Sequence, residues 1–438
     1  MKPAILSRRK FLKSAAAAIA APTIVPSTVF GANAPSNRLH MGCIGVGRMG
    51  RGDMRSFMGF KDLQVVAVCD VDSNRAKDAL QLVEQKYADH KRSGTYKGCA
   101  VTGDFREVTG RDDIDVVMVC TPDHWHILPA IEAAKAGKDI FLQKPLSLTI
   151  EEGRVLSNTV HRYGRVLQVG CQRRSDSRCR FGCELVRNGR IGKLHTVKVG
   201  TGADPATKLY PPMPVPENLD YNFWLGPAPY KPYTEKRVHP QEGYSRPGWL
   251  RVTDYSAGMV TGWGTHFIDI AHWGMGTELT GPVEIKGEAT FPSDGVWDVH
   301  GPFLIEYQYA NGVKVLYADS RKLKMGIRFE GTEGWVHVGH GKIETEPKSL
   351  LTSRIRPNEI HLYESRSHKG NLLDCIKTRR QTVAPVEVGH RTCTACLLGD
   401  IAMRLGRTLH WDPDREQFVN DPEADRWIGR PMRAPWRL

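Results

Sequence analysis

The chain has 438 residues, of which 40% are hydrophobic and 25% charged, and its formal net charge is +13. This composition is typical of a soluble globular protein with room for two sizeable domains. The basic surface either has no particular partner or attracts an anionic ligand. No nucleic-acid-binding motif accompanies it, so we expect neither DNA nor RNA as a partner.

Residues 1–34 have the features of a targeting segment. Ser7–Lys13 contains paired arginines and precedes a short alanine-rich run, Ser14–Ala21, as in a twin-arginine signal. The alternative is an isolated amphipathic helix, and the run is too short to span a bilayer. We expect export by the twin-arginine route and a mature protein that begins near Ala34 or Pro35. Its location would be periplasmic or membrane-tethered.

Strands and helices alternate along residues 35–165 and just beyond. Apolar runs separated by helical periodicity indicate βαβ units and a parallel sheet. The expected strands are Leu39–Ile44, Leu63–Cys69, Val116–Cys120, Asp139–Leu142 and Val166–Gly170. The expected helices are Arg48–Phe60, Ser73–Tyr87, His126–Ala136 and Thr149–Tyr163. We therefore predict an α/β protein whose first domain, residues 35–165, is a doubly wound parallel sheet.

The pattern changes after about residue 192, where strands follow one another with few helices between them. The expected strands are Leu194–Val199, Val283–Thr290, Phe303–Tyr309, Val313–Tyr317, Ile327–Gly331 and Trp335–Val338. Two helices follow, His368–Arg379 and Gly389–Gly406. Residues 166–410 are thus predicted to form an α+β domain with a large, mostly antiparallel sheet. Residues 411–438 are expected to lie along the surface as a tail.

Thr201–Tyr255 lacks a periodic pattern and is rich in Pro, Trp and Tyr. A loop of this length is either a functional lid or an assembly arm.

The chain has ten cysteines, of which Cys43, Cys69 and Cys120 lie in apolar strand runs and are interpreted as small core residues. Cys393 and Cys396 have redox-like spacing, but they lie inside a helical pattern, which favours core packing over a redox pair or a zinc site. His124, His126, His266 and His272 match no metal-ligand spacing, and we predict no metal.

A glycine loop and an acidic residue predict a dinucleotide site. Gly45, Gly47 and Gly50 follow the first strand and open a helix, whose N-terminus suits a pyrophosphate. Asp70 ends the next strand, where it can bond the adenine ribose and repel a 2′-phosphate. NAD is therefore favoured over NADP, although Arg75 lies nearby.

Two further segments follow strands of the same sheet. Thr121 and Pro122 come after Val116–Cys120 and either contact the cofactor or form a helix-entry turn. His126 likewise either contacts the cofactor or is only an N-terminal residue of the next helix. The predicted cofactor contacts are Gly45, Gly47, Arg48, Met49, Gly50, Asp70, Thr121, Pro122, His126, Gln143 and Lys144.

Lys144 lies just past the carboxyl end of a strand, where ligands bind in open parallel sheets. A lysine of ordinary pKa is a poor base at neutral pH, but desolvation and a positive nicotinamide ring would lower its pKa. Without the glycine loop, Lys144 would be interpreted as a surface residue. His266 and Asp269 share a helix face, and the histidine can complete a proton relay begun by Lys144.

The chain resembles the glucose-fructose oxidoreductase/inositol dehydrogenase/MocA family from about Asn37 to the C-terminus. The motifs are GVGRMG (45–50), Asp70, TPDHWH (121–126), QKP (143–145) and GTHFIDIAHW (264–273). FEGTEGWV (329–336) and the closing helices resemble its secreted, twin-arginine-exported bacterial branch. The resemblance implies a Rossmann domain and a sheet-rich domain that binds substrate and builds dimers or tetramers.

Most members of that family move a hydride to or from cyclic polyols and sugars, and some are glycosidases that use NAD transiently. By resemblance, Lys144 matches the catalytic lysine and His266 the catalytic histidine. Two positions differ: Gln143 replaces a glutamate, and Gly262 replaces the aspartate four residues before the histidine. The family's relay through that aspartate is therefore missing.

Other residues are candidates for the substrate site. Asp254, Tyr255 or Asp269 are expected to compensate for Gly262. Gln172 and Arg173 either contact substrate or belong to a structural ion pair. The sequence leaves three hypotheses: an NAD-dependent dehydrogenase of a sugar or glycoside, an NAD-recycling glycosidase, and a non-catalytic carbohydrate- or nucleotide-binding protein.

Overall fold

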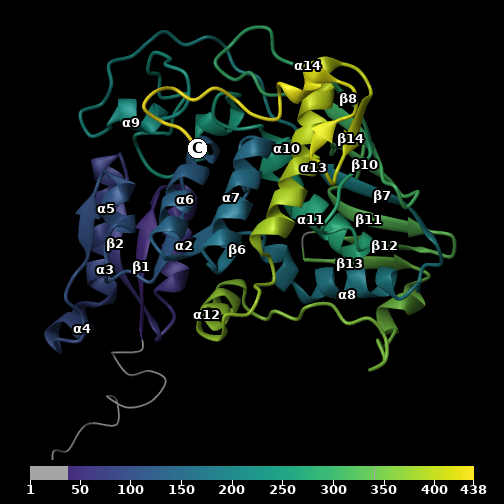
Figure 1. Cartoon of the computed structure of the whole chain (residues 1–438), viewed down its shortest axis with the longest axis horizontal. Helices are drawn as coiled ribbons and strands as arrows, with labels where there is room; N and C mark the ends of the chain where they lie inside the picture. The colour runs from purple at the N-terminus through teal and green to yellow at the C-terminus, as the bar shows by residue number, and fades with distance from the viewer. Residues whose placement is uncertain (1–37, 340) are drawn as a thin grey trace, which may run out of the picture.

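The computed structural model describes residues 38–339 and 341–438. Two parts lie side by side, the N-terminal part on the left of Figure 1 and the C-terminal part on the right. The expected signal segment, residues 1–34, lies outside the described residues. Within the described ranges, no helix is long and apolar enough to cross a membrane.

The N-terminal part is built on a six-stranded parallel sheet. Its strands are β1 (Leu39–Ile44), β2 (Leu63–Cys69), β3 (Ala100–Thr102), β4 (Val116–Val119), β5 (Asp139–Leu142) and β6 (Leu167–Val169). They lie in the order β3-β2-β1-β4-β5-β6. Strands β2 and β4 are buried along their whole length, as expected of a parallel sheet covered on both faces. The predicted doubly wound sheet is confirmed.

The helices of this part have local start signals in the sequence. They are α2 (Arg48–Phe57), α3 (Ser73–Lys86), α4 (Ala88–Arg92), α5 (Phe105–Thr109), α6 (Ile127–Lys135) and α7 (Ile150–Arg162). A capping box formed by Thr149 and Glu152 begins α7. The carboxylate of Asp72 accepts two backbone N–H bonds at the start of α3. The short elements β3, α4 and α5 were not expected, because elements of this length are too short to show a periodic pattern of apolar residues.

The first sheet extends past residue 165, where the first domain was expected to end. Strand β6 pairs in parallel with β5, so the expected strand at 166–170 belongs to this sheet. Pairing between strands, which periodicity does not reveal, sets the boundary.

The C-terminal part contains a nine-stranded, mostly antiparallel sheet. Its strands are β7 (Leu194–Thr201), β8 (Glu284–Ala289), β9 (Phe303–Gln308), β10 (Lys314–Asp319), β11 (Gly326–Gly331), β12 (Trp335–Val338), β13 (Ile343–Glu346), β14 (Leu409–Asp412) and β15 (Gln417–Phe418). The order is β13-β12-β11-β7-β10-β9-β8-β14-β15, and only β7 and β10 pair in parallel among these strands. The α+β domain is confirmed.

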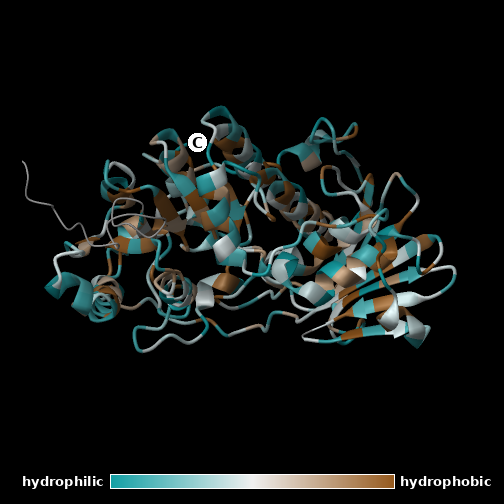
Figure 2. Ribbon diagram, turned by 90° about the horizontal axis from the view of Figure 1, so that it is seen from below, coloured by the Kyte–Doolittle hydropathy of each residue, from teal (hydrophilic) through white to brown (hydrophobic). Residues whose placement is uncertain are grey.

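Helices cover one face of this sheet. They are α8 (Ser177–Arg187), α10 (Met259–Gly262), α11 (Gly264–Met275) and α13 (Val386–Leu405). Helix α12 (His368–Thr378) instead lies beside β6, where Gln168 donates to the carbonyl of His368 at 2.5 Å. In β9, Phe303, Ile305 and Tyr307 are buried while the residues between them are half-exposed. Figure 2 shows the same alternation of hydrophobic and hydrophilic residues along the strands of this sheet. Helix α13 runs diagonally between the two parts (Figure 1).

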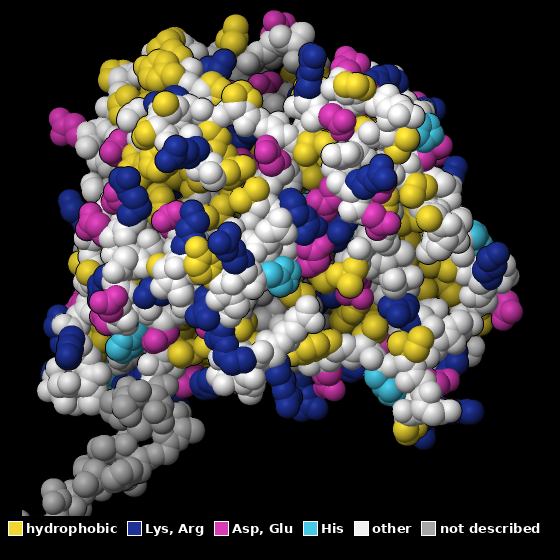
Figure 3. Space-filling model, viewed as in Figure 1, with side chains coloured by type: hydrophobic (Ala, Val, Ile, Leu, Met, Phe, Trp, Pro, Cys, Tyr) yellow, Lys and Arg dark blue, Asp and Glu magenta, His cyan; other side chains and the backbone are white. Residues whose placement is uncertain are grey.

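The segment 201–255, called the arm from here on, lies over the top of the N-terminal part (Figure 1). It contains helix α9 (Tyr221–Leu225) and a small core of its own, formed by Leu219, Tyr221, Trp224, Leu225, Ala228, Tyr233, Val238, Val252 and Tyr255. Its surface carries exposed apolar side chains, among them Leu209 and Tyr230, at 70% and 68% exposure. Figure 3 shows hydrophobic side chains gathered on the same upper left region. The arm is therefore an ordered layer.

The C-terminal tail is more integrated than expected. Strands β14 and β15 extend the large sheet, and helix α14 (Pro422–Asp425) follows. Trp411 is 2% exposed, and Trp436 stacks on Phe223 of the arm. The tail contains too few apolar residues to signal this packing in the sequence, so the expected surface segment is in fact an edge of the fold.

Candidate active site

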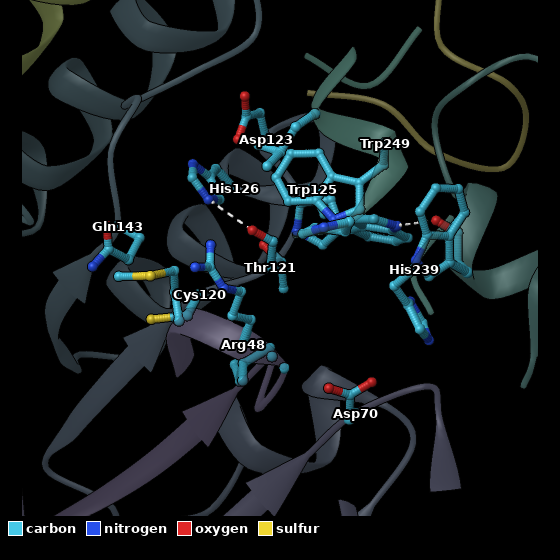
Figure 4. A pocket seen from close by; sticks show the side chains of 18 of the residues that line it. Arg48, Asp70, Cys120, Thr121, Asp123, Trp125, His126, Gln143, His239 and Trp249 are labelled. Carbon is cyan, nitrogen blue, oxygen red and sulfur yellow. Dashed lines mark hydrogen bonds between the residues drawn. The ribbon is translucent and has the colours of Figure 1, made fainter. Parts of the chain in front are cut away.

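A cavity of about 370 Å³ lies between the first sheet, the arm and helices α10 and α11. Its walls come from the carboxyl ends of β1, β2, β4 and β5, which meet at one edge of the sheet. In Figure 4, Asp70 and His239 lie at one end and Gln143 at the other. The cavity is elongated in the way an extended ligand requires.

The glycine loop has the geometry of a phosphate cradle. Gly45 has φ +79°, and a Cβ on Gly50 would lie 1.9 Å from the carbonyl oxygen of Gly45. A Cβ on Gly47 would meet only the Arg75 guanidinium, at 3.5 Å, so its cavity side is open to a ligand. Helix α2 begins there with no side-chain cap. The loop therefore fits the pyrophosphate of a dinucleotide.

Asp70 is held at the adenosine end of this cavity. Its two carboxylate oxygens accept backbone N–H bonds from Val46 and Asp72, each at 3.0 Å. Burial raises the pKa of Asp70, and these bonds oppose the change. Arg75 lies 3.5 Å from the carboxylate of Asp72 and donates to the carbonyl of Pro240 at 2.8 Å. The charge of Arg75 is thus largely compensated.

The TPDHWH segment forms the middle of the cavity wall. The hydroxyl oxygen of Thr121 is buried and has no hydrogen-bond partner among the described residues, as expected of a group that faces a ligand. His126 is clamped between the carbonyls of Pro145 and Thr121, at 2.6 and 2.9 Å. Burial lowers the pKa of His126 to about 4, so the neutral ring donates to one of these two carbonyls at a time while it packs between the two loops.

The presence of a glutamine rather than a glutamate at position 143 is explained by its contact with Asp53. Its side-chain amide donates to the Asp53 carboxylate at 2.7 Å, and Lys369 pairs with the other oxygen of Asp53 at 2.7 Å. A glutamate at 143 would place a second carboxylate against Asp53. The departure from the family pattern is therefore matched by a residue on α2.

Lys144 and His266 line the same cavity as the glycine loop. The Lys144 ammonium group donates to the carbonyl of Gly262 at 2.7 Å. Burial lowers the pKa of Lys144 from its ordinary value. The ring of His266 stands edge-on to Trp263, with centroids 5.9 Å apart. The structure thus brings together the two residues expected to act in acid–base catalysis.

The predicted substrate residues fall in different places. Gln172 lines the cavity, whereas Arg173, Asp254, Tyr255 and Asp269 do not.

Three of these residues have structural contacts instead. Arg173 lies 4.4 Å over the ring of Phe267. Tyr255 is fully buried in the core of the arm. Asp269 forms a buried ion pair with Arg174 at 2.8 Å. These contacts were not visible in the sequence, because the partners are distant along the chain.

Asp123 and the arm supply wall residues that sequence reasoning missed. The arm and α10–α11 contribute Phe223, Trp224, His239, Arg246, Trp249 and Trp263. The Pro-, Trp- and Tyr-rich composition of residues 201–255 was the available signal. Asp123 lay inside the TPDHWH motif, but nothing in the sequence distinguished it from a turn residue.

All ten cysteines are unpaired, and Cys393 and Cys396 are fully buried, as predicted. Residues 38–339 and 341–438 contain no group of three or more His, Cys, Asp or Glu side chains placed to hold a metal ion.

The strand order, the glycine loop and Asp70 define a dinucleotide-binding α/β protein. The family model for the NAD-binding Rossmann fold of an oxidoreductase family matches residues 39–171, and that for its C-terminal alpha/beta domain matches residues 202–438. The chain therefore belongs to this oxidoreductase family, the glucose-fructose oxidoreductase/inositol dehydrogenase/MocA family. It is an NAD-binding oxidoreductase by family.

Relatives in sequence are moderately similar. The chain is 26% identical over 298 residues to the uncharacterized oxidoreductase YrbE of Bacillus subtilis. The matched region covers 67% of this chain and 71% of that protein. It is 30% identical to an alpha-N-acetylgalactosaminidase of Shewanella oneidensis over 43% of this chain, and the match spans 44% of that enzyme.

Solved structures share the fold. The WlbA dehydrogenase of Bordetella pertussis, in complex with NADH and UDP-GlcNAcA, has a TM-score of 0.59 at 16% identity, over 86% of this chain and 99% of that one. The aldose-aldose oxidoreductase of Caulobacter crescentus has a TM-score of 0.59 at 17% identity, over 85% and 99%.

Proposed function

We propose that this protein is an NAD-dependent oxidoreductase that moves a hydride to or from a hydroxyl-bearing carbon of a sugar or glycoside. The observation that carries the proposal is that Lys144 and His266 line one cavity with an open glycine loop. Position C3 of the sugar ring is the first to examine.

The chemistry follows from the groups around Lys144. Bound NAD supplies the hydride acceptor. A neutral Lys144 amine takes the hydroxyl proton, and burial favours that neutral form by lowering the lysine pKa. His266 lines the same cavity and acts as the second acid–base group, and Gln172 lies where it can orient the remaining hydroxyls. Trp249 and Trp263 offer flat apolar rings to the C–H face of a pyranose.

We propose NAD rather than NADP as the cofactor. Asp70 would repel a 2′-phosphate, and Arg75 is already engaged by Asp72 and Pro240. Fluorescence titration with NADH and NADPH tests this, and tighter binding of NADPH would reverse the assignment.

The second candidate is a glycosidase that uses NAD transiently, by oxidation and elimination. It is favoured by the way the arm closes over the adenosine end. Asn218 and His239 both bond the Asp72 carboxylate, at 2.8 and 2.9 Å, and Tyr244 donates to Asp78 at 2.6 Å. A cofactor enclosed in this way suits a cycle in which it is reduced and reoxidised without leaving.

One experiment separates these functions. Protein carrying its cofactor is mixed with free sugars and with methyl and p-nitrophenyl glycosides, and absorbance at 340 nm and products are followed together. Net NADH supports the dehydrogenase, and bond cleavage without net NADH supports the glycosidase. Binding without either reaction would leave a non-catalytic carbohydrate- or nucleotide-binding protein. The Lys144→Met variant is the control.

We also propose export by the twin-arginine route and assembly into a dimer or tetramer. The first rests on the paired arginines in Ser7–Lys13, and the second on the exposed apolar side chains of the arm. Cell fractionation tests the first. Light scattering on the purified protein tests the second, and a monomer at micromolar concentration would contradict it.

A further inference from the structure

We propose that Asp123 is the acid–base partner of Lys144 and replaces the carboxylate that the family pattern places at position 262. The proposal rests on the proposed function, because it concerns the same site. It assigns Asp123 a positioning role: the carboxylate sets the charge of Lys144 and accepts its proton through water in the cavity.

Asp123 is a buried acidic residue in the cavity wall. It follows β4 and begins a 3₁₀ turn, Asp123–Trp125, and it is 2% exposed. One oxygen accepts a bond from the Ser256 hydroxyl at 2.7 Å, and Ser256 in turn accepts from the backbone N–H of Gly258 at 3.2 Å. The carboxylate is thus fixed on the wall that it shares with Lys144.

The lack of an ion pair distinguishes Asp123 from buried carboxylates elsewhere in the fold. Asp139 pairs with Arg379, Glu152 with Arg430 and Asp269 with Arg174, at 2.6, 2.8 and 2.8 Å. Among the described residues, Asp123 has no such partner. A buried carboxylate without one costs free energy, and such costs concentrate at functional sites.

The charges of Asp123 and Lys144 are coupled. Burial raises the pKa of Asp123 to about 7, while the Ser256 bond and the Lys144 charge oppose the change. Burial lowers the pKa of Lys144, while the Asp123 charge opposes it. The two groups therefore form a coupled pair, in which the charge of one changes the pKa of the other.

Other ionisable groups near the pair do not compete for the proton. His124 and His126 are neutral, because burial lowers their pKa values to about 3 and 4. Burial raises the pKa of Cys393 to about 11 and that of Cys171 further, so both thiols stay protonated. Arg246 adds positive charge and lowers the Lys144 pKa, and Asp53 is paired with Lys369.

The proton balance is complete without a further reagent. Oxidation of the hydroxyl breaks one C–H bond, whose electron pair leaves with the hydride to NAD, and one O–H bond, whose proton goes to the Lys144 amine. The ammonium group then passes that proton to the Asp123 carboxylate. In the reverse direction, Asp123 returns the proton to Lys144, which protonates the forming alkoxide.

Position 262 offers a direct test, because it has room for the missing side chain. A Cβ on Gly262 would meet nothing within 4 Å, and the Gly262 carbonyl already contacts the Lys144 ammonium group. An aspartate there would place a carboxylate beside Lys144 without repacking. The variant Gly262→Asp should therefore substitute for Asp123.

The first measurement needs no substrate. Competitive acetylation at a series of pH values, read by peptide mass spectrometry, gives the apparent pKa of Lys144 in the folded full chain. We expect Asp123→Asn to lower it by about one unit and Gly262→Asp, added to that variant, to raise it again. Asp319→Asn is the matched control, since Asp319 is 1% exposed and lies in β10, away from the cavity. An unchanged Lys144 titration in Asp123→Asn would overturn the proposal.

The second measurement uses the substrate found in the panel. In Asp123→Asn, single-turnover hydride transfer should fall about 100-fold, with the acid limb of its pH profile moved to lower pH. Asp123→Glu and the Asp123→Asn/Gly262→Asp double variant should recover at least tenfold. A loss with an unmoved pH profile and no recovery would show a merely structural role.

Thermal melting and NADH fluorescence show whether each variant folds. Should Asp123→Asn not fold, Gly262→Asp alone still tests the coupling, since it must raise the Lys144 pKa. If no substrate in the panel reacts, the proposed function fails, while the acetylation result still decides the role of Asp123.

Discussion

The ammonium group of Lys144 donates to the backbone carbonyl of Gly262 at 2.7 Å. In the family pattern, position 262 carries an aspartate, and here only its backbone reaches the lysine. The contact holds the amine in the cavity with a neutral acceptor, which does not compensate a positive charge. Burial therefore lowers the Lys144 pKa with little opposition from this side.

Replacing Lys144 with methionine should lower the rate of hydride transfer by about 10² to 10⁴, the range associated with a general base. Methionine is unbranched and only one atom shorter than lysine but has no amine to accept the proton, so NADH affinity should stay within about twofold. Stopped-flow absorbance measures the rate of hydride transfer, and fluorescence titration measures the NADH affinity. Lys135→Met is the control, because Lys135 is exposed and pairs with Glu132. Full activity in Lys144→Met would remove the proposed base.

Restoring the family residue at position 143 should harm this protein. In Gln143→Glu, a second carboxylate faces Asp53, and the bond of 2.7 Å becomes a repulsion. We expect a loss of about 1–3 kcal/mol in the free energy of unfolding. Urea denaturation measures it, and Gln143→Glu/Asp53→Asn should recover most of the loss. Equal stability of Gln143→Glu and wild type would show that the site relaxes around the charge.

Loosening the arm should speed release of the cofactor. Asn218→Ala removes a bond to Asp72, and Tyr244→Phe removes only the hydroxyl bond to Asp78. Together they should raise the NADH dissociation rate about thirtyfold, because each lost bond stabilises closure by about 1 kcal/mol. Displacement of NADH by excess NAD, followed by fluorescence, measures the rate. Tyr230→Phe is the control on an exposed tyrosine of the arm. An unchanged rate would mean that the cofactor leaves without moving the arm.

The link between tail and core should depend on pH. Burial raises the pKa of Glu416, but bonds from His390 and Arg154 lower it from 4.5 to about 2. Because the pKa of Glu416 is lower in the folded state, its ionised form stabilises the fold above about pH 4.5. This contribution to stability is lost as the pH falls through about 2. Glu416→Gln should therefore melt below wild type at pH 7, and the two melting temperatures should converge toward pH 2. A constant difference would place the effect in packing.

Local sequence determined most of the first domain. The all-apolar run Leu63–Cys69, the glycines at 45, 47 and 50 and the capping box at Thr149 each act within a few residues. Their physical causes, which are burial, backbone freedom and N–H capping, are readable along the chain. The sequence likewise placed Lys144 at a strand end and His266 on a helix.

Only the tertiary structure decided which polar residues surround Lys144. The helical spacing of Asp269 made it a plausible relay residue. In the structure its carboxylate instead accepts hydrogen bonds from Arg174, which is 95 residues away along the chain. Asp123 looked like a turn residue, yet Ser256, which directly follows the arm and is 133 residues away along the chain, donates a hydrogen bond to it. The charge of a side chain depends on its burial and on the partners that folding brings to it. The sequence alone therefore determined that a lysine follows the carboxyl end of a strand, and the fold decided which carboxylate lies in the same cavity wall.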